Sequence, residues 1–377
     1  MNIVYAALVR MPTEKAHGIQ IMKTCSALAQ AGVELELVVP DRKTKSNTTP
    51  FVYYKVPENF SITKLPGWDF ISRGWFGPLD YWLHSYFFAR AVRGFLKKSQ
   101  QGTVLFTRDL LLAFLLSKTS VPVFYEIHTL PKKILSIHRV AWKRAQGIVV
   151  ISEGLRAALI AAGVPAEKIV VARDSVDVDQ FQNIPTQAEC REKLNISLDQ
   201  KIVVYTGHLY DWKGPNTLAL ATEKLVQENI HVYLVGGTDT DVAAFRNKFS
   251  SSNLHILGHK QHEEIPLWLG SADLLVIPNS AKQAIGALYT SPLKLFEYIA
   301  VGKPIVASDV PALREVLNSR ATFFEPDNVS SLAEAITSGF KNYQEHLVVA
   351  KDLAATASQY SWQERARLLK DFIIKHS

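Results

Sequence analysis

Residues 290–309 read TSPLKLFEYIAVGKPIVASD, and they carry more structural information than any other segment of this chain. The pattern predicts a turn, a helix that carries Glu297 near its start, a break at Gly302-Lys303-Pro304 and a short apolar strand. The N-terminus of a helix gathers unpaired N–H groups and the positive end of the helix dipole, so it suits a phosphate. The Glu297 carboxylate can accept hydrogen bonds from sugar hydroxyls. The segment therefore predicts a site that binds a phosphate beside a sugar.

The composition indicates a folded protein with two domains. The chain has 377 residues, of which 47% are hydrophobic and 20% are charged, and this length is long for one core. No run approaches the roughly 20 apolar residues of a membrane-spanning helix. The apolar start, residues 1–7, predicts a first strand and not a signal peptide. Cys25 and Cys190 form no metal or redox spacing, as expected of buried thiols in a reducing cytosol. We therefore expect a cytoplasmic protein.

The charge of the chain is unevenly distributed. The net charge is +7, but residues 1–180 hold 23 Lys and Arg against 14 Asp and Glu, whereas the remainder holds 19 against 21. A one-sided positive charge indicates an anionic partner. The sequence contains no helix-turn-helix, zinc-finger or RNA-reading signature, so we expect no nucleic acid. An anionic membrane surface fits the basic half better.

Apolar runs alternate with amphipathic stretches along nearly the whole chain, which favours parallel sheets covered by helices on both faces. In the first half, strands are expected at 3–7, 35–39, 104–107, 121–126 and 147–151, and helices at 17–31, 110–118, 134–145 and 153–162. The alternation then restarts, with strands at 202–206, 232–235, 255–257, 274–277 and 305–307, and helices at 215–227, 241–249, 263–269, 293–301 and 331–340.

Two α/β domains in tandem account for this alternation. Residues 177–194 are polar, contain Pro185 and lack a strand pattern, so we place the linker there. The predicted domains are residues 1–180 and residues 186–360, and the amphipathic segment 362–377 either stays with the second domain or crosses back to the first. The expected fold class is α/β, with two Rossmann-like, doubly wound parallel sheets and a ligand at the carboxyl ends of their strands.

A glycine loop follows the first strand of the second half. Residues 207–215 read GHLYDWKGP, which predicts a strand, a loop and a helix that opens with Pro215. Gly207 allows a ligand to approach the backbone, and Lys213 can place a point charge on a diphosphate. The loop matches neither the Walker A nor the dinucleotide pattern. Taken alone, an ordinary strand–helix turn with a solvated lysine explains it equally well. Gly236-Gly237 ends the next strand and can also admit a ligand.

The order of these segments resembles the retaining glycosyltransferase family 4. The resemblance is sharp over residues 200–325 and looser over the first half, and its motifs are Gly207…Lys213-Gly214, Leu234–Gly237, Ala272–Pro278 and Leu295–Ser308. It implies the GT-B fold, in which two Rossmann-like domains face each other across a cleft and the second holds a nucleotide diphosphate sugar. It also implies that no metal or other cofactor is needed.

The resemblance assigns donor-binding roles in the second half. It implies that Lys213 contacts the diphosphate and that Glu297 contacts the ribose hydroxyls. The backbone around Ser291, Leu293 and Lys294 is expected to approach the phosphates. Gly207 and Gly237 complete the predicted donor site.

The sequence departs from the family pattern at two positions. His208 stands where the family usually has an arginine, and a histidine carries full charge only if its pKa is raised. Tyr289 stands where the family usually has the first of two glutamates, and a tyrosine can hydrogen-bond a sugar hydroxyl but supplies no negative charge. These departures indicate either a variant in which Lys294 adds charge at the phosphates, or a loss of activity.

The first half supplies further candidates at strand ends. The loop at His17-Gly18 follows the first strand, and the resemblance implies that it approaches the donor; a helix-entry turn is the alternative. The resemblance also implies that His128, at the end of a strand, lies beside the donor sugar as a catalytic residue. Glu126 and Arg108 are weaker candidates for contacts on the acceptor side.

Residues 65–98 combine aromatic and basic side chains. Trp68, Phe70, Trp75, Phe76, Tyr81, Trp82, Tyr86, Phe87 and Phe88 are interleaved with Arg73, Arg90, Arg93, Lys97 and Lys98. Interfacial segments place aromatic rings at the headgroups and cations on lipid phosphates. The pattern therefore predicts either peripheral binding to an anionic membrane or a buried helix with solvated cations.

The resemblance implies a function: transfer of a hexose from a nucleotide diphosphate sugar to a hydroxyl acceptor, with retention at the anomeric carbon. The expected acceptor is a glycan or lipid-linked glycan in surface polysaccharide or glycolipid synthesis. Lys213, His208 and helix-terminal N–H groups would stabilise the charge on the departing diphosphate. Two alternatives stay open, a nucleotide-sugar epimerase and a non-catalytic sugar-nucleotide-binding module, the latter suggested by Tyr289.

Overall fold

The computed structural model describes residues 1–13, 15–44, 47–66 and 79–377. The described chain forms two compact units, the first made of Met1–Arg173 with Trp362–Ser377 and the second of Asp174–Ser361. Part of the aromatic segment predicted at residues 65–98, including Trp68, Trp75 and Phe76, lies outside the described residues. None of the described helices combines the length and the apolar character needed to cross a membrane.

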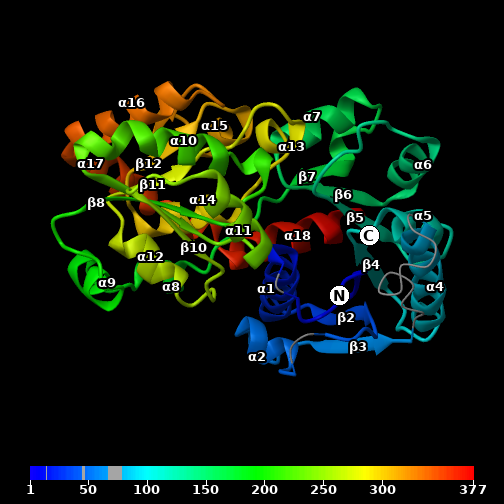
Figure 1. Cartoon of the computed structure of the whole chain (residues 1–377). Helices are drawn as coiled ribbons and strands as arrows, with labels where there is room; N and C mark the ends of the chain where they lie inside the picture. The colour runs from blue at the N-terminus through cyan, green and yellow to red at the C-terminus, as the bar shows by residue number, and fades with distance from the viewer. Residues whose placement is uncertain (14, 45–46, 67–78) are drawn as a thin grey trace. The chain divides into compact units, whose positions relative to one another are not determined.

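The first unit is built on a parallel sheet of seven strands (Figure 1). The strands are β1 (Asn2–Ala6), β2 (Glu34–Pro40), β3 (Ser61–Leu65), β4 (Thr103–Thr107), β5 (Val123–Ile127), β6 (Gly147–Val150) and β7 (Ile169–Val171). Their order is β3-β2-β1-β4-β5-β6-β7. The direction of winding reverses between β1 and β4, and such a reversal opens a crevice at the carboxyl ends of the strands.

Helices cover the sheet of the first unit. They are α1 (Ala16–Gln30), α2 (Pro50–Tyr54), α4 (Leu79–Leu96), α5 (Leu110–Leu116), α6 (Ser136–Arg144), α7 (Glu153–Ala161), the 3-10 turn η1 (Ala166–Lys168) and α18 (Trp362–His376). The last of these, α18, lies beside α1 although the two are at opposite ends of the sequence (Figure 1). Lys370 Nζ donates to the Ala31 carbonyl at 2.6 Å, which fixes the end of α1 to α18.

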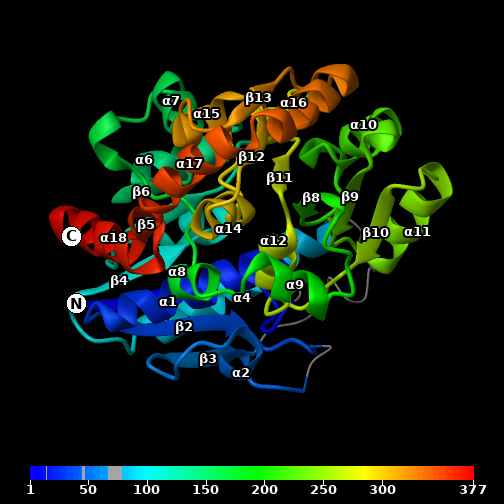
Figure 2. The ribbon, with the colours of Figure 1, turned by 90° about the vertical axis from the view of Figure 1, so that its left-hand side faces the viewer.

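The second unit repeats the plan with six parallel strands (Figure 2). They are β8 (Lys201–Thr206), β9 (Ile230–Val235), β10 (Leu254–Gly258), β11 (Leu274–Ile277), β12 (Ile305–Ser308) and β13 (Thr322–Phe324), in the order β10-β9-β8-β11-β12-β13. Alternate residues of β8 belong to different hydrophobic clusters, Ile202 and Val204 to one and Val203 and Tyr205 to the other. Since successive side chains of a strand point to opposite faces, both faces of this sheet are buried, as a parallel sheet requires.

Helices and short 3-10 turns surround the second sheet. They are α8 (Val178–Gln182), α9 (Gln187–Lys193), η2 (Asp211–Lys213), α10 (Pro215–Leu225), η3 (Val226–Glu228), α11 (Asp239–Lys248), α12 (Ile265–Ser271), α13 (Ala284–Ala287), α14 (Leu293–Val301), α15 (Pro311–Leu317), α16 (Val329–Lys341), α17 (Tyr343–Ala354) and η4 (Ala357–Tyr360). The predicted fold class, two Rossmann-like parallel-sheet domains, is confirmed.

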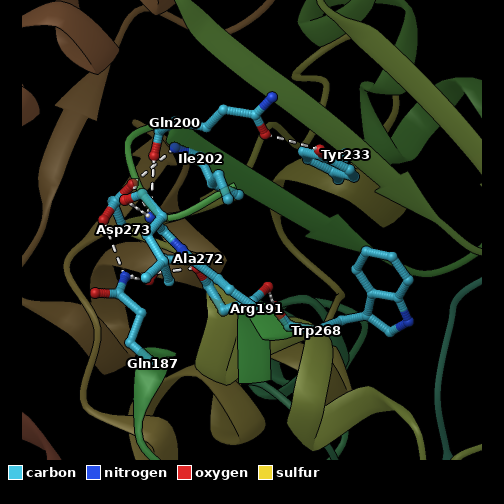
Figure 3. A network of polar contacts seen from close by, with 10 residues as sticks. Gln187, Arg191, Gln200, Ile202, Tyr233, Trp268, Ala272 and Asp273 are labelled. Atoms are coloured by element: carbon cyan, nitrogen blue, oxygen red, sulfur yellow. Dashed lines mark hydrogen bonds and ion pairs between the residues drawn. The ribbon is translucent and has the colours of Figure 1, made fainter. Parts of the chain in front are cut away.

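The prediction of a linker at 177–194 differs from the structure, because this segment contains α8 and α9. Arg191 of α9 is 4% exposed and donates to the Ser271 carbonyl at 3.0 Å and to Asp273 Oδ2 at 2.9 Å. Asp273 Oδ2 also accepts from the Ile202 N–H at 2.7 Å, which joins the network to β8 (Figure 3). The polar residues that suggested a linker therefore anchor the segment to the second unit.

Candidate functional site

The carboxyl ends of the strands in the second unit meet in a tight backbone corner. Gly207 follows β8 and Gly236 follows β9, and the Gly207 N–H donates to the Val235 carbonyl at 2.9 Å. Gly236 has φ +132°, and a Cβ on it would lie 2.3 Å from the Gly207 carbonyl oxygen. Only glycine fits this position. The corner places the loop after β8 at the switch point of the sheet, where ligands of such folds bind.

Two lysines converge on Gly207 from different elements. Lys213 ends the turn η2 and Lys294 lies in the first turn of α14. A Cβ on Gly207 would lie 3.7 Å from Lys294 Nζ and 3.8 Å from Lys213 Nζ. The two nitrogens are therefore no farther apart than the sum of these distances. Such a pair of cations matches the charge and the size of a diphosphate.

The Lys294 amino group is buried against an aromatic ring. The residue is 6% exposed, and its Nζ lies 3.6 Å from the centroid of the Tyr205 ring. Among the described residues it has no hydrogen-bond partner. Burial, and then the nearby charge of Lys213, hold the pKa of Lys294 well below its ordinary value. Burial also lowers the pKa of Lys213, to about 8.

Glu297 lies one turn farther along α14 and is held by a histidine. The residue is 8% exposed, and its Oε1 lies 3.2 Å from His262 Nε2. Tyr298, the next residue, ties α14 to the sheet, because its Oη accepts from the Thr206 N–H at 2.8 Å. His262 was not among the predicted site residues. It lies in the loop between β10 and α12, and no sequence pattern connects it to Glu297.

The segment that leads into α14 carries the other predicted donor-site residues. Leu293 is the first residue of the helix, and Pro292 at the N-cap offers no side-chain acceptor to its N–H groups. Ser291 is buried and its Oγ accepts from the Asp174 N–H at 2.9 Å. Tyr289 is partly buried after α13, where its N–H donates to the Ala284 carbonyl. Lys294 places the first turn of α14 beside Gly207, and an approach of this segment to the phosphates stays a prediction.

His208 and Gly237 also lie at this edge of the sheet. The His208 ring stacks on Tyr210, with centroids 5.0 Å apart and planes inclined by 9°, and its carbonyl accepts from Tyr205 Oη at 2.7 Å. Gly237 has φ +92°, and a Cβ on it would lie 2.9 Å from the Leu209 side chain. The loop after β8 therefore packs against the turn after β9.

In the first unit, the predicted residues Arg108, Glu126 and His128 belong to one network. Glu126 is fully buried, and its Oε1 lies 3.1 Å from His128 Nε2 and 3.0 Å from Gln20 Nε2, which donates to it. Arg108 Nη1 donates to Gln20 Oε1 at 2.9 Å. The three predicted residues therefore lie together at the carboxyl ends of β4 and β5.

The centre of this network is a carboxylate with several partners. Arg365 of α18 donates to Glu126 Oε1, and Tyr5 Oη donates to Glu126 Oε2 at 3.2 Å. Burial alone would raise the pKa of Glu126, but His128, Arg365 and Arg108 together hold it well below its ordinary range. Arg365 was not predicted, because it lies 239 residues from Glu126.

The loop at His17-Gly18 opens α1 in the same unit. A Cβ on Gly18 would lie 2.1 Å from Tyr54 Oη, and that hydroxyl donates to the Thr13 carbonyl at 2.7 Å. Gly18 therefore allows α1 to start against α2. His17 is partly exposed beside it. A donor-binding role for either residue stays a prediction.

Two family models match this chain. Residues 18–180 match the model described as Glycosyltransferase Family 4, and residues 200–342 match the model described as Glycosyl transferases group 1. Among curated relatives, the amylovoran biosynthesis glycosyltransferase AmsK from Erwinia amylovora is 29% identical over 208 residues, which are 52% of this chain and 48% of that protein. The chain spans about half the length of the first curated relatives that it matches.

Solved structures match over nearly the whole chain. Sucrose-phosphate synthase from Thermosynechococcus elongatus superposes with a TM-score of 0.79 at 17% identity, over 99% of this chain and 98% of the other. HepE from Anabaena, in complex with UDP and glucose, superposes with a TM-score of 0.75 at 16% identity, over 99% of both chains. At such identities the likeness establishes the fold, which is GT-B. The two family models and this fold agree, and the chain belongs to family 4 of the glycosyltransferases, also described as the group 1 glycosyl transferases.

Proposed function

We propose that this protein is a retaining glycosyltransferase that moves a hexose from a nucleotide diphosphate sugar to a hydroxyl acceptor. The observation that carries the proposal is the convergence of the Lys213 and Lys294 side chains on Gly207, at the switch point of the second sheet. A glycan or lipid-linked glycan in polysaccharide or glycolipid synthesis is the acceptor we favour. The match to a protein named for amylovoran biosynthesis supports this class of product.

The chemistry assigned to the donor site is electrostatic. When the bond between sugar and diphosphate breaks, negative charge develops on the departing diphosphate, and Lys213 and Lys294 stabilise it. The N–H groups at the start of α14 add to this stabilisation. Lys294 thereby supplies the cation that the family usually has at the position of His208. Glu297 accepts hydrogen bonds from the ribose hydroxyls, and the Tyr289 hydroxyl bonds the donor sugar.

The assignments in the first unit follow from the Glu126 network. His128 is the side chain that we assign to contact the donor sugar, and Glu126 positions its ring. The crystal structure of HepE from Anabaena holds UDP and glucose. A uridine diphosphate sugar is therefore the first donor to test.

The test of the donor site is calorimetry with nucleoside diphosphate sugars. Lys213→Ala and Glu297→Ala should each weaken donor binding by about 10- to 100-fold, because each removes a charged hydrogen-bond partner worth roughly 1.5–3 kcal/mol. Lys224→Ala, which removes an exposed lysine of α10, is the matched control and should bind as the wild type does. Unchanged affinity in both site variants would remove the assignment. His128→Ala should lower turnover and leave donor affinity nearly unchanged.

Tyr289 favours a second candidate function, a sugar-nucleotide-binding module without catalysis, because no carboxylate stands at this position. The two candidates differ in turnover. Donor binding without transfer to any member of an acceptor panel, and without release of free sugar, would favour the binding module.

We also propose that the protein binds an anionic membrane surface through α4. Among the described residues of this helix, Tyr81, Trp82, Tyr86 and Phe87 are 38–44% exposed. Arg90 and Arg93 on the helix, and Lys97 and Lys98 just after its end, are also exposed. Aromatic rings at the headgroup level beside cations are typical of interfacial segments.

Flotation with liposomes tests this membrane proposal. Binding should require anionic lipid and weaken as salt rises, because screening shortens the range of the attraction. The double substitution Trp82→Ser with Tyr86→Ser should reduce flotation, whereas Leu198→Ser, at an exposed apolar residue of the second unit, should not. Equal flotation with neutral lipid would contradict the proposal.

A further inference from the structure

Lys294 is buried without the partners that a buried ammonium normally has. Removing a charged lysine from water is unfavourable, and the attraction to an aromatic ring returns only a small part of the lost hydration. The Tyr205 ring is the contact at 3.6 Å, and no described residue accepts a hydrogen bond from Nζ. The balance of these terms favours the neutral amine.

The charged groups around Lys294 also favour its neutral form. Lys213 opposes a positive charge at Nζ, and Glu297 favours one, but Oε1 of Glu297 is already in contact with His262. The titratable groups near Lys294 come from several elements: Tyr205 of β8 contacts its Nζ, Lys213 of η2 and Glu297 of α14 act on its charge, and His262 before α12 contacts Glu297. Of these, Lys213 and Glu297 act on the Lys294 charge most directly.

We propose that Lys294 is a neutral amine in the ligand-free protein and takes up a proton when a diphosphate binds, so that donor binding is coupled to protonation. The inference rests on the proposed function, because it assigns the diphosphate to the point where the two lysines converge. The proton comes from solvent and adds to the Nζ lone pair. The oxygens of the bound diphosphate then accept hydrogen bonds from the ammonium N–H groups, for which no described residue offers an acceptor. When the nucleoside diphosphate leaves, the proton returns to solvent.

The coupling has a defined sign. The diphosphate stabilises only the ammonium form, so it raises the pKa of Lys294 above its value in the free protein. Between those two pKa values, the affinity for the donor falls by up to tenfold for each unit of rising pH. An arginine at the same place carries its charge at every pH. Lys294→Arg therefore keeps the cation and removes the titration.

The experiment is calorimetry at pH 7 with UDP-glucose, GDP-mannose and ADP-glucose, whose diphosphates have no ionisation near neutral pH. Each titration is repeated in buffers that differ in ionisation enthalpy, and the slope of the measured heat against that enthalpy gives the protons taken up. The wild type should take up close to one proton. Lys213, with a pKa of about 8, should account for only about 0.1 of it.

Variants and pH separate the inference from the proposed function. Lys294→Arg should bind the same sugar nucleotide with an uptake of about 0.1 proton, and Lys224→Arg should keep the wild-type uptake. The affinity of the wild type for the sugar nucleotide should fall as the pH rises above 7. This measurement needs no variant. Binding without proton uptake, or an unchanged uptake in Lys294→Arg, would overturn the inference and leave the donor site intact. Failure of the wild type to bind any of the three probes would overturn both.

Discussion

Glu126 in the first unit and Lys294 in the second are both ionisable and buried at the carboxyl edge of their sheets, but their surroundings are opposite. Glu126 in the first unit is fully buried and contacts Tyr5, Gln20, His128 and Arg365. Lys294 in the second unit is 6% exposed and rests on an aromatic ring. A buried charge with its partners in place fixes the geometry of its neighbours. A buried amine without partners is kept for a ligand that supplies them.

The largest effect should follow from removal of the Glu126 carboxylate. Glu126→Ala leaves the Arg365 guanidinium buried without its counter-ion, and breaking a buried pair in this way costs about 3–5 kcal/mol. Urea unfolding should show this loss in the free energy of unfolding.

A double-mutant cycle controls that measurement. Arg365→Met combined with Glu126→Ala removes both charges and should restore much of the stability that either single substitution loses, because no charge is then buried alone. A loss below about 1 kcal/mol for Glu126→Ala would contradict the structural role given to the carboxylate.

Substitution of Lys294 should change stability in the opposite direction. Lys294→Met keeps the length of the side chain and removes a buried polar group without hydrogen bonds, so the free energy of unfolding should rise by about 1 kcal/mol. The affinity for the sugar nucleotide should fall at least tenfold at the same time. A variant that loses stability as Glu126→Ala does would show that Lys294 has a structural partner, and the contrast between the units would fail.

The sequence was sufficient to predict the elements on which both residues lie. The helix predicted at 293–301 has the bounds of α14, because its apolar spacing is regular and Gly302 ends it with φ +70°. The buried strands were predicted within a few residues for the same reason, since their apolar runs are continuous. The short strands β3, β7 and β13 and the helices α2, α8, α9, α13, α15 and α17 were missed, because most of them are brief or polar and depend on tertiary contacts.

The partners of the two residues could not be predicted. Glu126 meets Arg365 across 239 residues of sequence, and Glu297 meets His262 across 35. The first contact exists because α18 packs back on α1 and β6, and the second because the loop before α12 reaches α14; no local pattern records which side chains meet there. The sequence thus indicated where the candidate site lies, and the structure was needed to tell a satisfied charge from an unsatisfied one.

The smallest expected effect concerns a second carboxyl of the first unit. Asp109 follows β4, and its Oδ2 accepts from the Leu8 N–H at 2.8 Å. Burial raises the pKa of Asp109 to about 6, because the Leu8 hydrogen bond and the Arg108 charge only partly offset it. Asp109 is therefore intermediate between Glu126, which has several partners, and Lys294, which has no hydrogen-bond partner among the described residues.

The pH dependence of stability tests this intermediate case. A folded-state pKa of about 6 exceeds the value of about 3.9 in an unfolded chain, so ionisation of Asp109 destabilises the fold progressively from about pH 4 to pH 6 and by a constant amount above. Asp109→Asn keeps an acceptor for the Leu8 N–H and removes the charge. Its melting temperature should exceed that of the wild type by about 2–4 °C at pH 7.5 and equal it near pH 4, whereas Asp352→Asn, at an exposed position, should match the wild type at both. A gain that persists at pH 4 would mean that the charge is not its cause, and Asp109 would then no longer stand between Glu126 and Lys294 in this comparison.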